Sequence, residues 1–126
     1  MLIKNILLVA FGGGLGSVSR FLCQKYIYEA HPQAFPLGTF LVNISGCLLI
    51  GIFSGLAEKG NLLTPDWRLL LTTGLCGGFT TFSSFAFENI ALMKGGYFGY
   101  FVLYTAGSVV LGLLATWLGL TLIKAI

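Results

Sequence analysis

The sequence predicts an all-α membrane protein made of four transmembrane helices. Hydrophobic residues make up 56% of the 126 residues and charged residues only 9%. A soluble domain would carry roughly 25% charged residues, so this composition is typical of a protein in lipid. A helix needs about 20 apolar residues to cross the hydrocarbon core, and four such stretches fill the chain. The apolar residues do not alternate with polar ones, which favours helices over a membrane β-barrel.

Each span is an apolar run bounded by polar or turn-forming residues, and all four belong to one domain covering residues 1–126. The spans are predicted at residues 5–28, 37–56, 67–93 and 97–123. Residues 64–66, Thr-Pro-Asp, predict a helix start, because proline suits the first helical position. Residues 94–96, Lys-Gly-Gly, predict a tight turn between the last two spans.

The positive charges are almost evenly divided between the two sides of the membrane. An even number of spans puts both termini on one side. That side carries Lys4, Lys59, Arg68 and Lys124, and the other carries Arg20, Lys25 and Lys94. Orientation normally follows an excess of Lys and Arg on the cytoplasmic side, and four against three is hardly an excess. We therefore expect insertion in both orientations and pairing of two copies as an antiparallel homodimer.

Glycines recur at a spacing of four residues in every span. The pairs are Gly12 with Gly16, Gly51 with Gly55, Gly74 with Gly78, and Gly95 with Gly99. Such pairs let helix backbones approach closely in lipid, where no hydrophobic effect drives helices together. Four thin helices enclose little volume, so a pathway through the protein is expected to need an oligomer.

Small and hydroxyl residues interrupt the third span near its middle. Residues 72–88 read TTGLCGGFTTFSSFAFE. Glycine costs about 1 kcal/mol relative to alanine in a helix, so this segment is weakly held to helical geometry. A break there frees backbone carbonyls, which is tolerated only inside protein or beside a cavity. Freed carbonyls are suited to holding a cation such as Na⁺.

Phe82 and Phe85, three residues apart, share one face of a helix. Their rings either pack in the core or offer their positive edges to a small anion. Asn43, seven residues into the second span, either bonds helices together or donates its amide protons to an anion. These alternatives stay open at the level of sequence.

Three further polar side chains lie inside the spans. Arg20 either extends to the membrane boundary or positions the first connection or a vestibule. Glu88 is a proton-coupled carboxylate, a gate, or a residue that reaches water. Tyr104 and Ser108, four residues apart, face one way and are predicted to line one pathway.

Several function classes do not fit the sequence. The net charge of +3 is small and scattered, which does not suit a nucleic-acid surface. The glycines in residues 6–17 resemble a dinucleotide-binding turn but lack the required βαβ unit. There is no ATP motif and no arrangement of nucleophile and base, so the protein is not expected to be an enzyme.

The whole chain resembles the Fluc (CrcB) family of bacterial fluoride channels. The matching motifs are GGGLGSVSR at 12–20, PLGTFLVNISG at 36–46, and TTGLCGGFTTFSSFAFE at 72–88. The resemblance implies an antiparallel, dual-topology homodimer in the inner membrane, with two fluoride pores and a Na⁺ at the dimer interface. It also implies a third helix broken at its centre, where carbonyls at Gly77 and Thr80 hold the Na⁺.

The resemblance also assigns roles to the polar and aromatic residues. It implies that ring edges of Phe82 and Phe85 and the amide of Asn43 line the pores. It further implies a hydroxyl track formed by Ser83, Ser84, Tyr104 and Ser108. Thr39 matches a vestibule position, Glu88 a carboxylate near the end of the path, and Arg20 the arginine of the first helix. The implied activity is passive fluoride export, which lowers cytoplasmic fluoride and its toxicity.

The alternative is a small proton-coupled multidrug or cation exporter, a class that also has four short helices and can form antiparallel dimers. Such exporters need a membrane carboxylate, typically on the first span. Here the first span carries Arg20 and no acid, and Glu88 is the only membrane carboxylate. A third possibility is a helix bundle that supports a larger complex, but it leaves Asn43 and the hydroxyl–phenylalanine cluster without a purpose.

Overall fold

The computed structural model describes residues 1–60 and 62–126, and all regular secondary structure in these ranges is helical. The elements are α1 (Leu2–Ala30), α2 (Leu37–Glu58), α3 (Pro65–Arg68), the π-helix η1 (Leu69–Cys76), α4 (Gly77–Phe79), α5 (Phe82–Lys94) and α6 (Phe98–Ala125). Four stretches within the described ranges are long and apolar enough to cross a membrane: Leu2–Ala30, Leu37–Glu58, Pro65–Lys94 and Phe98–Ala125. The prediction of four spanning helices is therefore confirmed.

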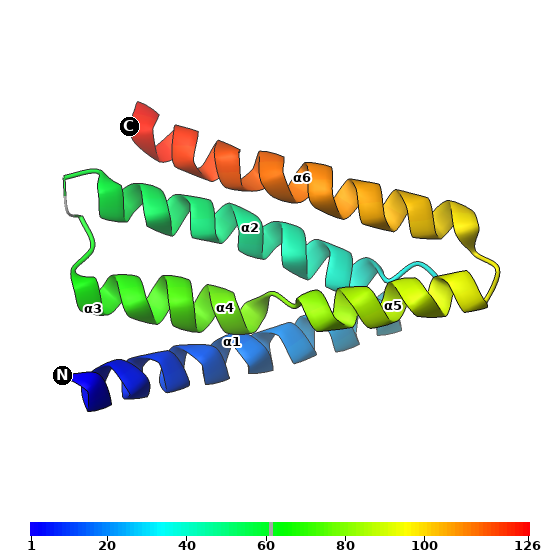
Figure 1. Cartoon of the computed structure of the whole chain (residues 1–126), viewed down its shortest axis with the longest axis horizontal. Helices are drawn as coiled ribbons and strands as arrows, with labels where there is room; N and C mark the ends of the chain where they lie inside the picture. The colour runs from blue at the N-terminus through cyan, green and yellow to red at the C-terminus, as the bar shows by residue number, and fades with distance from the viewer. Residues whose placement is uncertain (61) are drawn as a thin grey trace.

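The four spans lie roughly side by side and run alternately in opposite directions, so that both termini lie at one end (Figure 1). The elements α3, η1, α4 and α5 follow one another as the third span (Figure 1). The helix α2 packs mainly on α6, and α1 packs mainly on η1 and α4. The bundle thus consists of two closely packed helix pairs.

Glycines allow α1 to lie directly against the backbone of the third span. A Cβ atom at Gly16 would overlap the carbonyl oxygen of Leu75, and one at Gly78 would overlap that of Gly13. A Cβ at Gly12 would lie 3.0 Å from the amide nitrogen of Leu75. Because no side chain fits between the two helices, these glycines determine how closely they pack, as the spacing predicts.

Close backbone contact at glycines also joins α2 to α6. A Cβ at Gly51 would overlap the carbonyl oxygen of Thr116, and one at Gly119 would lie 2.6 Å from that of Leu48. The hydroxyl of Thr116 adds a hydrogen bond to the Cys47 carbonyl oxygen at 3.0 Å.

The fourth predicted glycine pair does not pack helices, so that prediction is wrong. No described atom lies within 4 Å of a Cβ built on Gly99. Gly95 instead belongs to the predicted turn, where Gly96 has a φ of +80° and the Tyr97 N–H donates to the Leu92 carbonyl oxygen at 2.9 Å. This is a glycine-dependent helix end, and the four-residue spacing here comes from the turn.

The π-helix in the first half of the third span was not predicted. The Gly77 N–H reaches the Thr72 carbonyl oxygen five residues back, as well as that of Gly74. Periodicity arguments test for 3.6 residues per turn and therefore do not detect eight residues of wider helix. Thr64 and Pro65 do start the span as predicted, with the Thr64 hydroxyl accepting from the Trp67 N–H at 3.3 Å.

Candidate functional site

The third span is interrupted at Thr80 and Thr81, which confirms the predicted break. Both residues have extended backbone, with φ and ψ of −89° and 158° for Thr80 and −150° and 118° for Thr81. The Thr81 hydroxyl then accepts a hydrogen bond from the Ser84 N–H at 3.1 Å and caps the start of α5. The interruption is therefore the end of one helix followed by a capped start of the next.

Asn43 pairs with the backbone of the break. Its Nδ2 donates to the Thr81 carbonyl oxygen at 3.1 Å, and its Oδ1 accepts from the Thr81 N–H at 2.8 Å. The amide thereby replaces the helical partners that Thr81 lacks. Asn43 thus bonds helices together, and since an amide NH₂ carries two protons, one remains beyond the bond to Thr81.

The break also releases carbonyl groups of α4. The Thr81 N–H would donate to Gly77 in a continuous helix but donates to Asn43 instead. The Gly78 carbonyl oxygen accepts from Nε of Arg20 at 3.1 Å. The structure therefore places the Arg20 side chain against the backbone beside the break. If Arg20 is left out of the count of positive charges at the two ends of the bundle, four charges at one end stand against two at the other, and the near balance is lost.

Most of the predicted site residues at the break line one groove of about 420 Å³, named here the break groove. They are Asn43, Gly77, Thr80, Phe82, Phe85 and Ser108. The rings of Phe82 and Phe85 have centroids 5.7 Å apart, and the Phe82 side chain is 79% exposed in the single chain. Among the described residues, the buried Ser108 hydroxyl has no hydrogen-bond partner.

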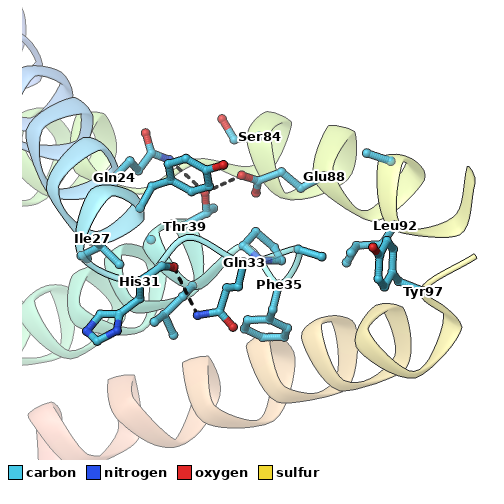
Figure 2. A pocket seen from close by; sticks show the side chains of 16 residues that line it. Gln24, Ile27, His31, Gln33, Phe35, Thr39, Ser84, Glu88, Leu92 and Tyr97 are labelled. Carbon is cyan, nitrogen blue, oxygen red and sulfur yellow. Dashed lines mark hydrogen bonds between the residues drawn. The ribbon is translucent and has the colours of Figure 1, made fainter. Parts of the chain in front are cut away.

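A second cavity of about 490 Å³ lies toward the end of the bundle opposite the termini, and we call it the Glu88 pocket (Figure 2). Thr39, Ser84 and Glu88 line it, together with Gln24 of α1, His31 and residues 33–36 of the first connection, and Leu37 and Gly38 at the start of α2. Figure 2 shows Thr39 between Gln24 and Glu88. Three predicted site residues thus converge from α2 and α5.

A chain of hydrogen bonds joins all four spans at this pocket, and we call it the relay. Gln24 Nε2 donates to the Thr39 hydroxyl at 2.9 Å. The Thr39 hydroxyl donates to Glu88 Oε2 at 2.8 Å, and the Tyr104 hydroxyl donates to Glu88 Oε1 at 2.8 Å. Both carboxylate oxygens are therefore satisfied by hydroxyl groups, which is what a carboxylate inside a membrane protein requires.

Tyr104 connects the relay to the break groove. Its side chain is fully buried, at 0% exposure, and its ring centroid lies 5.0 Å from that of Phe85. The ring also meets Phe35 edge-on at 5.5 Å and Phe40 at 6.3 Å. From the break toward the Glu88 pocket, the side chains therefore follow in the order Asn43, the two phenylalanines, Tyr104 and Glu88.

Sequence reasoning missed several residues of this site. Gln24 follows Arg20 by four residues, so a polar stripe on α1 was a usable signal. Asn89 is buried, and its Oδ1 accepts from the Thr105 hydroxyl at 3.0 Å, which ties α5 to α6. Ser83, by contrast, was predicted to belong to the site, but it lines neither of the two cavities, and its hydroxyl lies 3.3 Å from that of Thr81.

The fold and the site together define a class. Four membrane-length helices with an interrupted span, and a groove lined by phenylalanine rings, an amide and hydroxyls, are the features of a small multi-pass transport protein. The family described as "CrcB-like protein, Camphor Resistance (CrcB)" matches residues 7–120. This chain belongs to that family.

Relatives align with almost the whole chain. A fluoride-specific ion channel FluC of Flavobacterium psychrophilum is 50% identical over 121 residues, covering 96% of this chain and 98% of that protein. Proteins of the same name from Phocaeicola vulgatus and Methylobacillus flagellatus are 50% and 47% identical. The first of these two alignments covers 93% of this chain and 96% of the relative, and the second covers 95% and 94%.

Proposed function

We propose that this protein is a fluoride-selective ion channel of the bacterial inner membrane that lets fluoride leave the cytoplasm passively. The observation that carries the proposal is similarity at 45–50% identity, over more than nine tenths of the chain, to bacterial proteins named fluoride-specific ion channels. A channel needs no chemical step, so the protein is not an enzyme.

The groups along the site suit a small, strongly hydrated anion. A selective pore must replace the water around fluoride with several donors that bind loosely enough for the ion to leave. Three kinds of donor follow one another: the second amide proton of Asn43, the Ser108 hydroxyl without a protein partner, and the ring edges of Phe82 and Phe85. None carries a full positive charge that would trap the ion. Ser83 and Ser84 follow at the start of α5, and Ser84 also lines the Glu88 pocket.

The working unit is an antiparallel homodimer formed by copies inserted in opposite orientations. The break groove is open along the side of the single chain, and Phe82 is largely exposed there. Bilayer lipid cannot satisfy polar backbone at such a groove, so a second copy is the suitable cover. The charge balance that favours both orientations requires Arg20 to be counted with the loops during insertion.

A structural Na⁺ at the dimer interface would suit the carbonyls of Gly77 and Thr80. The Gly77 carbonyl has lost its helical donor, Thr80 is extended, and both residues line the open groove. Carbonyl oxygens are the ligands that hard cations prefer at helix breaks. The ion would hold two copies together at their breaks. Arg20 would keep the neighbouring Gly78 carbonyl occupied.

The exporter alternative finds less support. A proton-coupled exchanger needs a carboxylate that alternates between proton and substrate. Both oxygens of Glu88 already accept hydrogen bonds, from Thr39 and Tyr104. Such a carboxylate is suited to a fixed place beside an ion path.

The test is fluoride efflux from liposomes that contain the purified protein, measured beside chloride. Rapid fluoride-selective efflux is expected, with large losses in Phe82→Ile and Asn43→Ala. An absence of fluoride efflux from folded, dimeric protein would contradict the proposal. Cation-driven proton movement that depends on Glu88 would instead support the exporter.

A further inference from the structure

We propose that Gln24 is a positioning residue of the fluoride path, because its amide fixes the Thr39 hydroxyl so that the Thr39 proton points at Glu88. Gln24 acts through Thr39 and Glu88 and does not itself contact the ion. The inference deepens the proposed fluoride function and rests on it for its consequence in transport. The geometry of the relay supports the positioning role by itself.

The hydrogen bonds to Thr39 have a defined direction. A hydroxyl has one proton to donate and two sites that accept. Gln24 Nε2 lies 2.9 Å from the Thr39 oxygen and Glu88 Oε2 lies 2.8 Å from it. The amide nitrogen of Gln24 can only donate, so its proton fills an acceptor site on Thr39 and the single Thr39 proton goes to Glu88. Thr39 is 2% exposed, so water does not compete for these positions.

The direction of these bonds affects an anion that passes Glu88. Two hydroxyl dipoles, from Thr39 and Tyr104, point at the carboxylate and offset part of its negative charge. A Thr39 hydroxyl without Gln24 can turn its proton away from Glu88. Glu88 would then repel fluoride more strongly at the end of the path. Figure 2 shows Gln24 reaching Thr39 from α1, on the side away from Glu88.

Two substitutions at one position separate positioning from packing. Gln24→Met keeps the length of the side chain and removes the donor. Gln24→Glu reverses the bond, because an ionised carboxylate at this position accepts the Thr39 proton in competition with Glu88. Protonation of the introduced carboxyl restores a donor. A packing role would respond similarly to both variants at every pH.

We expect Gln24→Met to lower the fluoride efflux rate about threefold at all pH values, as for loss of one neutral hydrogen bond. Gln24→Glu should lower the rate about tenfold near pH 8 and return to the rate of Gln24→Met near pH 6. The control is Thr121→Val, since the exposed Thr121 hydroxyl only donates to the Trp117 carbonyl oxygen of its own helix at 2.8 Å and borders neither cavity. Its rate should equal that of the unmodified protein. Protein-free liposomes at each pH correct for leakage of HF. Equal pH profiles for the two Gln24 variants, or an unchanged rate in Gln24→Met, would overturn the proposal.

Infrared spectroscopy tests the positioning without any transport. Subtracting the spectrum of Glu88→Gln from that of the unmodified protein isolates the carboxylate stretching band of Glu88. Gln24→Met should shift this band, and Thr121→Val should not, because only the former changes the hydrogen bond that Glu88 accepts from Thr39. An unshifted band would overturn the positioning role even if fluoride moves rapidly. A shifted band in protein that does not conduct fluoride would retain the role and refute the proposed function.

Discussion

The two halves of the third span are held in the bundle by different interactions. The first half, from α3 to α4, lies against α1 with backbone on backbone at Gly12, Gly16 and Gly78. The second half, α5, is joined to α2 and α6 by hydrogen bonds that the side chains of Glu88 and Asn89 accept. The break at Thr80 and Thr81 separates the two modes.

This difference assigns the stability of the bundle to the first half and the ion path to the second half. Close backbone packing gains dispersion energy in lipid but tolerates no added atom, so the first half sets the geometry of the bundle. Hydrogen-bonded side chains allow a wider separation and leave polar groups beside cavities. The second half can therefore carry the polar path while the first half anchors it. Substitutions at four positions test this division, from the largest expected effect to the smallest.

Gly16→Ala should destabilise the protein most. The added methyl group would overlap the Leu75 carbonyl oxygen, which belongs to a backbone that cannot move aside. We expect a loss of about 2–3 kcal/mol, typical of overpacking. Thermal unfolding in detergent measures it. Gly14→Ala is the matched control, since a Cβ at Gly14 meets no described atom within 4 Å. Equal stability of the two variants would show that the contact of α1 with η1 is not tight.

Asn43→Leu tests the link between the two halves. It removes the donor and the acceptor that bond the part-buried Thr81 backbone, and the loss of these bonds should cost about 1–2 kcal/mol, less than Gly16→Ala. We expect efflux to fall at least about tenfold, with a lower unfolding temperature.

Asn43→Asp is the companion to this substitution. It keeps the acceptor for the Thr81 N–H and loses only the donor, so its stability should lie between those of Asn43→Leu and the unmodified protein. An Asn43→Leu variant as stable as the unmodified protein would contradict the role of Asn43 at the break.

Tyr104→Phe should separate transport from stability. The ring that packs on Phe85 remains, and only the hydroxyl that donates to Glu88 is lost. We expect fluoride efflux to fall about fivefold and stability to change by about 1 kcal/mol. Efflux and thermal unfolding of one preparation measure both. A variant that unfolds several kcal/mol more easily would place Tyr104 with the anchoring half instead.

Thr105→Val should have the smallest effect. It removes the hydrogen bond to Oδ1 of the buried Asn89 while keeping the shape of the side chain. We expect a loss of stability of about 1 kcal/mol and efflux within twofold of the unmodified protein, because Asn89 borders neither cavity. Efflux as low as that of Tyr104→Phe would extend the polar path to Asn89.

Local chemistry explains which features could be predicted from sequence. The helix start at Thr64, the turn at Gly96 and the break at residues 80–81 each depend on a few neighbouring residues. The glycine pairs of the first three spans also predicted close packing, but they did not predict which helix each pair would contact. The role of Arg20 was not predictable in this way, because it depends on a carbonyl group of a neighbouring helix. The π-helix was not predictable because periodicity tests for 3.6 residues per turn.

The sequence by itself determined that this is a membrane protein of four spans with a weak point in the third. Apolar length and charge decide what enters lipid, and glycine and threonine decide where a helix yields. Only the tertiary structure decided that Asn43 pairs with Thr81, that Arg20 meets Gly78, and that Gln24 completes the relay. Periodicity gives the face on which a residue lies within one helix. The rotation and register between helices come from how closely their glycine surfaces pack, and that follows from the assembled bundle alone.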